Sequence, residues 1–331
     1  MTFLEDFGIV KPKKPTARGR AKRPPQRRDR EGSMEYTVTA EEAGRKIRDI
    51  LRRSMGVSYT AMKSAKWNGR IFLNGESVYT DTPVQAGDTV RIEWAEETPA
   101  YRPRRFDLPL EIPWEDEHLL AVVKPAPLAS QSSRNHPDDS LENALYTYFG
   151  CPEDFVYRPV NRLDKGTSGL MMVAKTPHVQ HRMQRLLHTP AFRRRYLALT
   201  DGIPEAREGV IDLPIAKAPG ATVRRVISPE GKPSRTHYRV LEERDGKALI
   251  LLELETGRTH QIRVHLSAIG CPVRGDFLYG TERPEEYPGR FALHSAVILA
   301  EHPVTGERIL LTSRPEWAAD VPESVLLMDT D

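Results

Sequence analysis

The chain has 331 residues and a mass of 37.5 kDa, and 39% of its residues are hydrophobic, which suffices for two folded units with tails. No apolar run approaches the roughly 18 residues of a membrane span, and the N-terminus lacks the pattern of a signal peptide, so we expect a soluble cytoplasmic protein. The net charge is +3, and Cys151 and Cys271 are too few and too far apart for a disulfide framework or a thiolate metal site.

Residues 1–33 carry the excess positive charge. They contain ten Lys or Arg residues against four acidic ones, whereas the rest of the chain contains 39 against 42. Because this segment has few apolar residues, it is predicted to be a disordered tail. Such a tail attracts phosphate groups without regard to sequence and in a salt-dependent way. A solvated tail without a partner is the alternative interpretation.

Residues 34–94 are predicted to form a small α/β unit. Ile47, Ile50 and Leu51 have helical spacing, Asn68-Gly69 is a turn, and residues 70–75 have the pattern of a strand. This arrangement resembles an S4 RNA-binding domain, and the resemblance implies RNA contact through a basic helical face. The basic side chains in question are Arg45, Arg48, Arg52, Arg53, Lys63, Lys66 and Arg70. A solvated helix face of an ordinary protein has the same composition.

Residues 95–107 are polar and rich in proline, which predicts a linker and independent motion of the units on either side. From residue 108 to residue 320, short apolar strands alternate with fewer helices, which predicts a larger α+β unit, and residues 321–331 are a predicted C-terminal tail. Helices are predicted at 178–188 and after Gly257, the second ending at Gly270. No glycine-rich loop has the spacing that binds a dinucleotide or a triphosphate, so no cofactor is expected.

One polar segment of the larger unit, residues 161–170 with the sequence NRLDKGTSGL, leads directly into an apolar run that ends at Ala174. It would hold Asp164 on a rigid base at the edge of the core. An aspartate beside Gly and Ser usually caps or turns the chain. Two later segments favour a functional role instead, namely RRRYLAL at 193–199 and TGRTHQIRVHL at 256–266.

Together these segments resemble the RluA-type pseudouridine synthases, in which a loop Asp, a strand Tyr and a helix-borne basic residue form the active site. The resemblance extends from about Ile112 to Thr312 and implies the pseudouridine synthase fold, a mixed and mainly antiparallel sheet with flanking helices and loops. It includes Lys124-Pro125, Gly231-Lys232-Pro233, Gly275-Asp276 with Tyr279, and Leu293-His294-Ser295. Asn161 stands where the family usually has His, and Ala126 where Gly is common. These departures bear on target preference or rate rather than on the reaction.

The resemblance assigns a catalytic role to three residues. Asp164 is the candidate nucleophile or the base that acts on the ribose, and the sequence leaves both roles open. Arg263 is expected to keep Asp164 ionised, because a carboxylate taken from water needs a nearby cation. Tyr196 is expected to stack on the base and to assist a late proton transfer. Core packing of Tyr196 and a surface position of Arg263 are the structural alternatives.

A uridine in folded RNA must leave its stack before it can react. Arg162 lies beside the candidate nucleophile and is expected to fill the space that the extruded uridine leaves or to hold a neighbouring phosphate. Arg258 is expected to contact a phosphate or to organise its loop. Further basic residues could follow the RNA backbone, with an ion-paired surface as the alternative; they are Arg182, Arg185 and Arg193 with its neighbours Arg194 and Arg195.

The expected function is therefore isomerisation of uridine to pseudouridine in structured RNA by a monomeric enzyme. The S4-like unit favours large-subunit ribosomal RNA by analogy, and transfer RNA is the alternative substrate. A non-enzymatic RNA-binding or ribosome-assembly factor is the rival from another class, although such a factor would not need Asp164, Tyr196 and Arg263 together. A metal-dependent nuclease or other hydrolase is disfavoured, because the sequence has no paired carboxylates and no His cluster near Asp164. No metal is expected, since His260 and His265 lie on one predicted helix without a third ligand at metal spacing.

Overall fold

The structure, a computed structural model, describes residues 33–57, 59–93, 99–187 and 189–328. These residues fall into two units that adjoin in the sequence at Ala100 and Tyr101. Except for Ser33, the predicted N-terminal tail lies outside the described residues, as does part of the predicted linker. Within the described ranges, no helix combines the length and the apolar character needed to cross a membrane.

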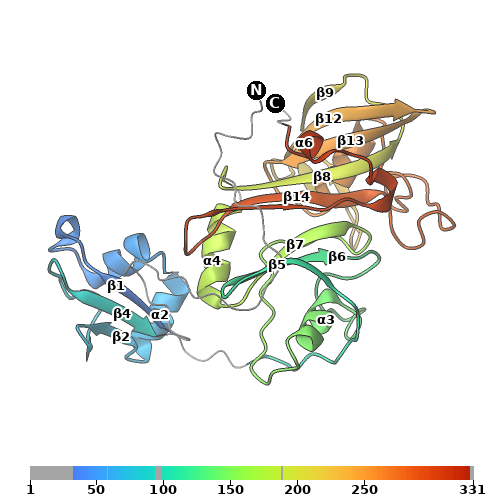
Figure 1. Ribbon diagram of the computed structural model, residues 1–331. Helices are drawn as coiled ribbons and strands as arrows, with labels where there is room; N and C mark the ends of the chain where they lie inside the picture. The colour runs from blue at the N-terminus through green and yellow to red at the C-terminus, as the bar shows by residue number, and fades with distance from the viewer. Residues whose placement is uncertain (1–32, 58, 94–98, 188, 329–331) are drawn as a thin grey trace. The chain divides into compact units, whose positions relative to one another are not determined.

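The N-terminal unit packs short helices against a four-stranded antiparallel sheet with the order β1-β4-β2-β3 (Figure 1). Its elements are β1 (Ser33–Thr37), η1 (Ala40–Glu42), α1 (Ile47–Asp49), the π-helical turn η2 (Ile50–Ser54), α2 (Tyr59–Trp67), β2 (Ile71–Leu73), β3 (Glu76–Ser77) and β4 (Thr89–Glu93). Ile47, Ile50 and Leu51 are buried in its core, as their helical spacing predicts. β1 was not predicted, because its pairing partner β4 lies at the other end of the unit. The resemblance to an S4 domain stays a prediction.

The larger unit is built on a nine-stranded sheet, counted over the described residues, with the order β5-β6-β7-β14-β8-β13-β12-β9 and β15 paired to β14. Its strands are β5 (Glu111–Glu115), β6 (Leu119–Lys124), β7 (Ser168–Ala174), β8 (Phe192–Asp201), β9 (Glu208–Asp212), β12 (Arg235–Arg244), β13 (Lys247–Leu254), β14 (Leu293–Glu301) and β15 (Arg308–Thr312). β10 (Ile215–Lys217) and β11 (Arg225–Ile227) form a separate hairpin. All neighbours in the large sheet are antiparallel except β7 and β14. The mixed, mainly antiparallel α+β architecture expected from the sequence is confirmed.

The helices of this unit are α3 (Leu141–Tyr148), α4 (Pro177–Leu186), α5 (Gln261–Ala268), η3 (Glu316–Ala318) and α6 (Glu323–Leu326). α4 and α5 lie where the apolar periodicity predicts them. Thr176 caps the N-terminus of α4 by accepting a hydrogen bond from the backbone N–H of Val179, and Gly270 follows α5 with a positive φ of 76°, which suits the end of a helix.

β7 and β14 approach each other unusually closely, and a glycine makes this possible. Gly169 lies beside Ser295 in the parallel register and has a φ of +107°. A Cβ atom at Gly169 would lie 2.3 Å from the backbone oxygen of Ser295, which no real side chain tolerates. The loop before β7, which carries Asp164, is therefore brought to the middle of the sheet, one strand away from β8.

Two predicted irregular segments are attached to the larger unit. In the predicted tail, Leu326 of α6 is fully buried against Leu197 and Leu251, and the guanidinium of Arg195 donates hydrogen bonds to the carbonyl oxygens of Leu326 and Met328 at 2.9 and 2.5 Å. In the predicted linker, the backbone N–H of Phe106 donates to Thr147 Oγ1 at 2.9 Å. The sequence missed both attachments because their partners lie far away along the chain.

A buried histidine makes this fold sensitive to acid. His294 lies between Ser168 Oγ, 2.8 Å from Nδ1, and Ser313 Oγ, 3.2 Å from Nε2, and burial lowers its pKa from 6.5 to about 4. As the pH falls from 6.5 to 4, the unfolded chain binds the proton and the folded chain does not, so stability is lost in this window. Burial also lowers the pKa values of His260 and His265, which adds to the effect.

We predict that His294→Gln weakens the loss of stability between pH 6.5 and 4 by about 3 kcal/mol, the equivalent of the shift at His294. Urea denaturation of both proteins at several pH values measures this, with His136→Gln, at a partly exposed position, as the matched control. Equal pH dependence of the parent and of His294→Gln would contradict the prediction.

Candidate active site

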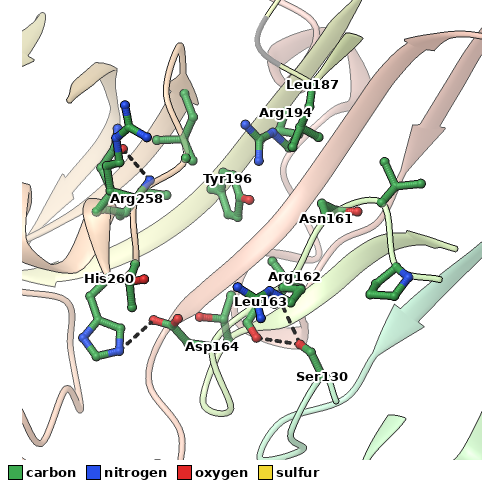
Figure 2. Close-up of a pocket in the computed structure, with 18 of the residues that line it drawn as sticks. Ser130, Asn161, Arg162, Leu163, Asp164, Leu187, Arg194, Tyr196, Arg258 and His260 are labelled. Carbon is green, nitrogen blue, oxygen red and sulfur yellow. Dashed lines mark hydrogen bonds and ion pairs between the residues drawn. The ribbon is translucent and has the colours of Figure 1, made fainter. Parts of the chain in front are cut away.

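An open pocket with a volume of about 760 Å³ lies in the larger unit (Figure 2). Residues from five parts of the chain line it: the segment around Ser130, the loop before β7, helix α4 with strand β8, the segment from the end of β13 to the start of α5, and the start of β14. The lining includes Asn161, Arg162, Asp164, Arg194, Tyr196, Arg258, His260 and Arg263. The pocket thus brings together the three predicted catalytic residues from separate parts of the sequence.

Hydrogen bonds to its backbone hold the loop that carries Asp164 in place. Ser130 Oγ donates to the carbonyl oxygen of Leu163 at 2.6 Å, and the N–H of Thr167 donates to the carbonyl oxygen of Asp164 at 3.1 Å. The buried ammonium group of Lys124 donates to three carbonyl oxygens, those of Pro125, Leu128 and Lys165, at 3.0, 2.8 and 3.3 Å. These contacts fix the loop on the sheet.

Burial lowers the pKa of Lys124 to about 7, and the charge of Asp164 opposes this shift. Because its three acceptors are backbone carbonyls, the ammonium form is the one that ties them together. Lys124 belongs to the segments that carry the family resemblance, yet the sequence did not indicate this role, because its acceptors lie on two separate turns.

A guanidinium group binds two carboxylates at the floor of the site. Arg263 makes a two-pronged ion pair with Asp276, with Nε 2.7 Å from Oδ2 and Nη2 2.9 Å from Oδ1. The remaining Nη1 donates to Asp164 Oδ2 at 3.0 Å. Arg263 and Asp276 are buried, whereas 25% of the Asp164 side chain is exposed. One carboxylate thus anchors the cation and the other faces the pocket.

Three aromatic rings surround this cation. The Cζ atom of Arg263 lies 4.3 Å from the ring centre of Phe291, 5.0 Å from that of Tyr279 and 5.7 Å from that of Phe277. Burial lowers the pKa of Arg263, but its hydrogen bonds to Asp276 and the charges of both carboxylates outweigh burial and raise the pKa above its ordinary value. The guanidinium therefore stays charged beside Asp164.

His260 also faces Asp164. It precedes α5 in a left-handed conformation, with a φ of 60°, and its Nε2 lies 3.8 Å from Asp164 Oδ2. Its Nδ1 lies 2.8 Å from the hydroxyl of Tyr279, which accepts a hydrogen bond from the N–H of Arg225. Since that hydroxyl proton remains to be donated, the contact favours the tautomer with its proton on Nε2. Burial lowers the pKa of His260, which favours the neutral ring.

Tyr196 lies on β8, opposite Ser295 of β14 and Leu252 of β13. Its side chain is buried, lines the pocket, and points toward the space above Asp164 in Figure 2. Burial raises the pKa of its hydroxyl, so the group is protonated at neutral pH. A ring in this position offers a flat face to a base and a proton at its edge.

The three consecutive arginines before Tyr196 do not share one surface. Successive side chains of a strand point to opposite faces. Arg193 and Arg195 lie on one face, where both bind Glu253, with Nε 2.5 Å from Oε1 and 2.7 Å from Oε2 respectively. Arg194 lies on the other face with Tyr196 and lines the pocket. The side chain of Arg193 is therefore engaged within the protein, and its predicted RNA contact has no further support.

The other predicted RNA-binding residues lie at several sites. Arg162 is exposed and lines the pocket, and Arg258 lines it while its Nε donates to the carbonyl oxygen of Pro233 at 3.2 Å. Arg182 and Arg185 of α4 are not among the pocket residues, although Arg185 is exposed. In the N-terminal unit Arg45, Arg48, Arg52 and Lys63 are exposed, as are Lys46, Arg53 and Lys66. Their RNA contacts stay predictions.

Asp276 and His260 are the site residues whose roles the sequence did not reveal. The pair Gly275-Asp276 was noted only as part of the resemblance, and His260 only as an incomplete metal ligand set. Their roles depend on distances to Arg263 and Asp164 that local patterns do not contain. Among the described residues, no group of three or more His, Cys, Asp or Glu side chains is arranged to hold a metal ion.

The comparisons with known proteins point in one direction. A family model described as RNA pseudouridylate synthase matches residues 118–268. The chain is 35% identical over 257 residues to "Uncharacterized RNA pseudouridine synthase YjbO" of Bacillus subtilis (strain 168), which covers 77% of this chain and 90% of that protein. It is 34% identical over 310 residues to "Ribosomal large subunit pseudouridine synthase D" of Escherichia coli (strain K12), which covers 88% of this chain and 91% of that protein.

Among solved structures, the chain is similar to Human RNA Pseudouridylate Synthase Domain Containing 1, with a TM-score of 0.52 and 27% identity over 62% of this chain and 84% of that chain.

We predict that Asp276→Asn lowers the free energy of unfolding by about 3 to 5 kcal/mol, because it removes a buried carboxylate from the buried Arg263. Glu286→Gln is the matched control, since Glu286 pairs with Arg274 at a half-exposed position and should cost about 1 kcal/mol or less. Urea denaturation of the three proteins measures both effects. Equal losses for the two variants would show that the buried ion pair does not anchor the fold.

Proposed function

Since this chain belongs to the RNA pseudouridine synthase family and is itself an RNA pseudouridine synthase, we propose that its substrate is large-subunit ribosomal RNA and that Asp164 acts on the target nucleoside. The ribosomal substrate is supported by the names of relatives that this chain matches over most of their length, including those of Escherichia coli and Nitrosomonas europaea. Transfer RNA is the alternative that the experiment below separates from it.

The observation that carries the role of Asp164 is its ion pair with Arg263. The pair places the cation of Arg263 3.0 Å from Oδ2 of the carboxylate. It also fixes one carboxylate oxygen, Oδ2, on the cation, and Asp276 fixes the cation in turn. Asp164 is partly exposed to the pocket, which supports a role toward a ligand in addition to its pairing with Arg263.

The reaction breaks the bond between C1′ of the ribose and N1 of uracil and forms a bond between C1′ and C5. Asp164 would either attack the nucleoside or take a proton from the ribose, and both routes need the same charged carboxylate. After the base turns, C5 gives up its proton and N1 gains one, so the product is an isomer of the substrate. The pocket must retain the detached base during this turn.

Tyr196 is positioned to hold the base. Its ring lines the pocket and its hydroxyl keeps its proton, because burial raises its pKa. We assign to the ring the stacking of uracil and to the hydroxyl a hydrogen bond that supports the late proton transfer.

RNA must also be brought to the pocket and opened there. Extrusion of the uridine from its stack costs a few kcal/mol, least in loops and bulges. Arg162 is exposed at the pocket and is the candidate for filling the vacated space. The exposed basic residues of the N-terminal unit named above are candidates for phosphate contacts farther along the RNA.

We predict that the parent protein releases tritium from C5-labelled uridine in bulk ribosomal RNA, and that Asp164→Asn lowers the rate by about a thousandfold or more, because the amide cannot act as nucleophile or base. Asp154→Asn, at an exposed position outside the pocket, is the matched control and should keep full activity. Release from transfer RNA alone would overturn the ribosomal assignment. Binding of RNA without any release would favour the assembly-factor interpretation.

We predict that Tyr196→Phe retains RNA binding and loses about a hundredfold or more in the rate of tritium release, the usual contribution of a positioned proton donor. Tyr238→Phe removes a hydroxyl from another buried tyrosine of the same sheet that is not among the pocket residues, and it should not change the rate. Full activity of Tyr196→Phe would exclude the proton role and leave stacking.

A further inference from the structure

One wall of the pocket carries two buried hydrogen-bond donors that the reaction described above does not use. Figure 2 shows Arg194 and Asn161 on the side of the pocket away from His260, with Tyr196 between the two sides. Arg194 comes from β8 and Asn161 from the loop before β7, so the sheet brings them to the same wall.

Among the described residues, no carboxylate forms an ion pair with the guanidinium group of Arg194. The residue is 5% exposed, and its Nε and Nη2 atoms are buried without a hydrogen-bond partner among the residues that the structure describes. In the described part of the chain, its guanidinium lies near one aromatic ring, that of Phe192, whose centre is 5.8 Å from Arg194 Cζ. The nearest acidic residue of this strand pair, Glu253, lies on the opposite face and binds Arg193 and Arg195.

Asn161 has a similar unsatisfied donor. Its Oδ1 accepts a hydrogen bond from the backbone N–H of Met172 at 2.9 Å, which fixes the orientation of the amide. Its Nδ2 is buried and has no partner in the described part of the chain. A carboxamide can hold Met172 with one end and present an N–H to the pocket with the other.

A buried cation without a partner is costly, because burial removes its water and nothing replaces it. The cost is recovered when an anion binds, since the same low dielectric strengthens the attraction. A guanidinium group presents its donors as a planar fork that matches two oxygens of a phosphate. The pocket is also larger than a base requires, because about 760 Å³ lies within the range of roughly 300 to 1,000 Å³ that encloses drug-sized ligands.

We propose that Arg194, assisted by the amide N–H of Asn161, binds a phosphate group of the RNA strand next to the extruded uridine. This inference rests on the proposed function, because it names the part of the RNA that the same pocket recognises. It also assigns a role to Asn161, the position at which this chain departs from the usual histidine of its family. The fixed phosphate would orient the ribose above Asp164 while the base turns.

Binding of small probes tests the proposal without requiring catalysis. Calorimetric titration of the full-length protein with uridine, uridine 5′-monophosphate and uridine 3′-monophosphate compares ligands that differ only in the phosphate. One monophosphate should bind about tenfold more tightly than uridine, as expected for a charge-assisted hydrogen bond, and the tighter one identifies the phosphate concerned. Arg194→Gln should abolish this preference without changing the affinity for uridine, and Arg194→Lys should retain part of it.

Two further variants sharpen the test. Asn161→Asp keeps the acceptor for Met172 but replaces the amide N–H with a negative charge, so it should weaken monophosphate binding and spare uridine. Arg239→Gln is the matched control, since Arg239 lies on β12 of the same sheet, binds Glu208 at 3.1 Å and is not among the pocket residues. It should leave the phosphate preference unchanged.

The proposal is overturned if the parent binds all three ligands with equal affinity, or if the preference for a monophosphate survives Arg194→Gln. It is also overturned if Arg194→Gln lowers the affinity for uridine as much as the affinity for the monophosphates, because Arg194 would then contact the base. With an active parent, Arg194→Gln should also make the negative slope of log(kcat/KM) against log[salt] shallower by about 0.7, which corresponds to the loss of one phosphate contact to a single strand. Absence of tritium release by the parent would count against the proposed function only, because the titrations do not depend on turnover.

Discussion

The candidate active site depends on one guanidinium group that binds two carboxylates with different exposure. The fork of Arg263 is occupied by Asp276, which is buried and also accepts the backbone N–H groups of Leu278 and Tyr279. Only Nη1 remains, and it fixes Asp164. A single carboxylate would leave the cation able to turn in the site. With two, the position of Asp164 is determined by a network that continues into the backbone of the loop after Asp276.

Aromatic side chains pack around the ion pairs of Arg263. The aromatic rings near Arg263 exclude water from the ion pairs, which strengthens them. Gly166 permits one of these contacts, since a Cβ atom there would lie 2.5 Å from the ring of Phe291. The glycines of the Asp164 loop are therefore required on both sides, Gly166 against an aromatic ring and Gly169 against the backbone of β14.

Successive side chains of strand β8 point to opposite faces of the sheet, and the two faces have different contacts. On one face Arg193 and Arg195 bind Glu253, and Arg195 also binds the carbonyl oxygens of the C-terminal segment. On the other face Arg194 and Tyr196 line the pocket. A run of like charges in the sequence therefore supplies two arginines that form ion pairs on one face of the sheet and one arginine that faces the pocket on the other. The two functions do not interfere, because the sheet lies between them.

The sequence by itself determined the reaction class, the mainly antiparallel α+β fold and the positions of α4 and α5. Periodicity and turn residues act over a few positions and are therefore visible in a linear pattern. The motifs around Asp164, Tyr196 and Arg263 were recognisable for the same reason, since each lies within one short segment.

Only the tertiary structure decided which groups meet. Asp276 binds Arg263 although 13 residues separate them in the sequence. Arg195 binds the carbonyl oxygen of Leu326 in the last helix, which packs on the same face of the sheet. Arg194 points to the opposite face from Arg193 and Arg195 and lines the pocket. These contacts follow from strand order and register, in particular the parallel pairing of β7 with β14. Pairings between distant segments are set by the burial of the whole core, and no local pattern specifies them.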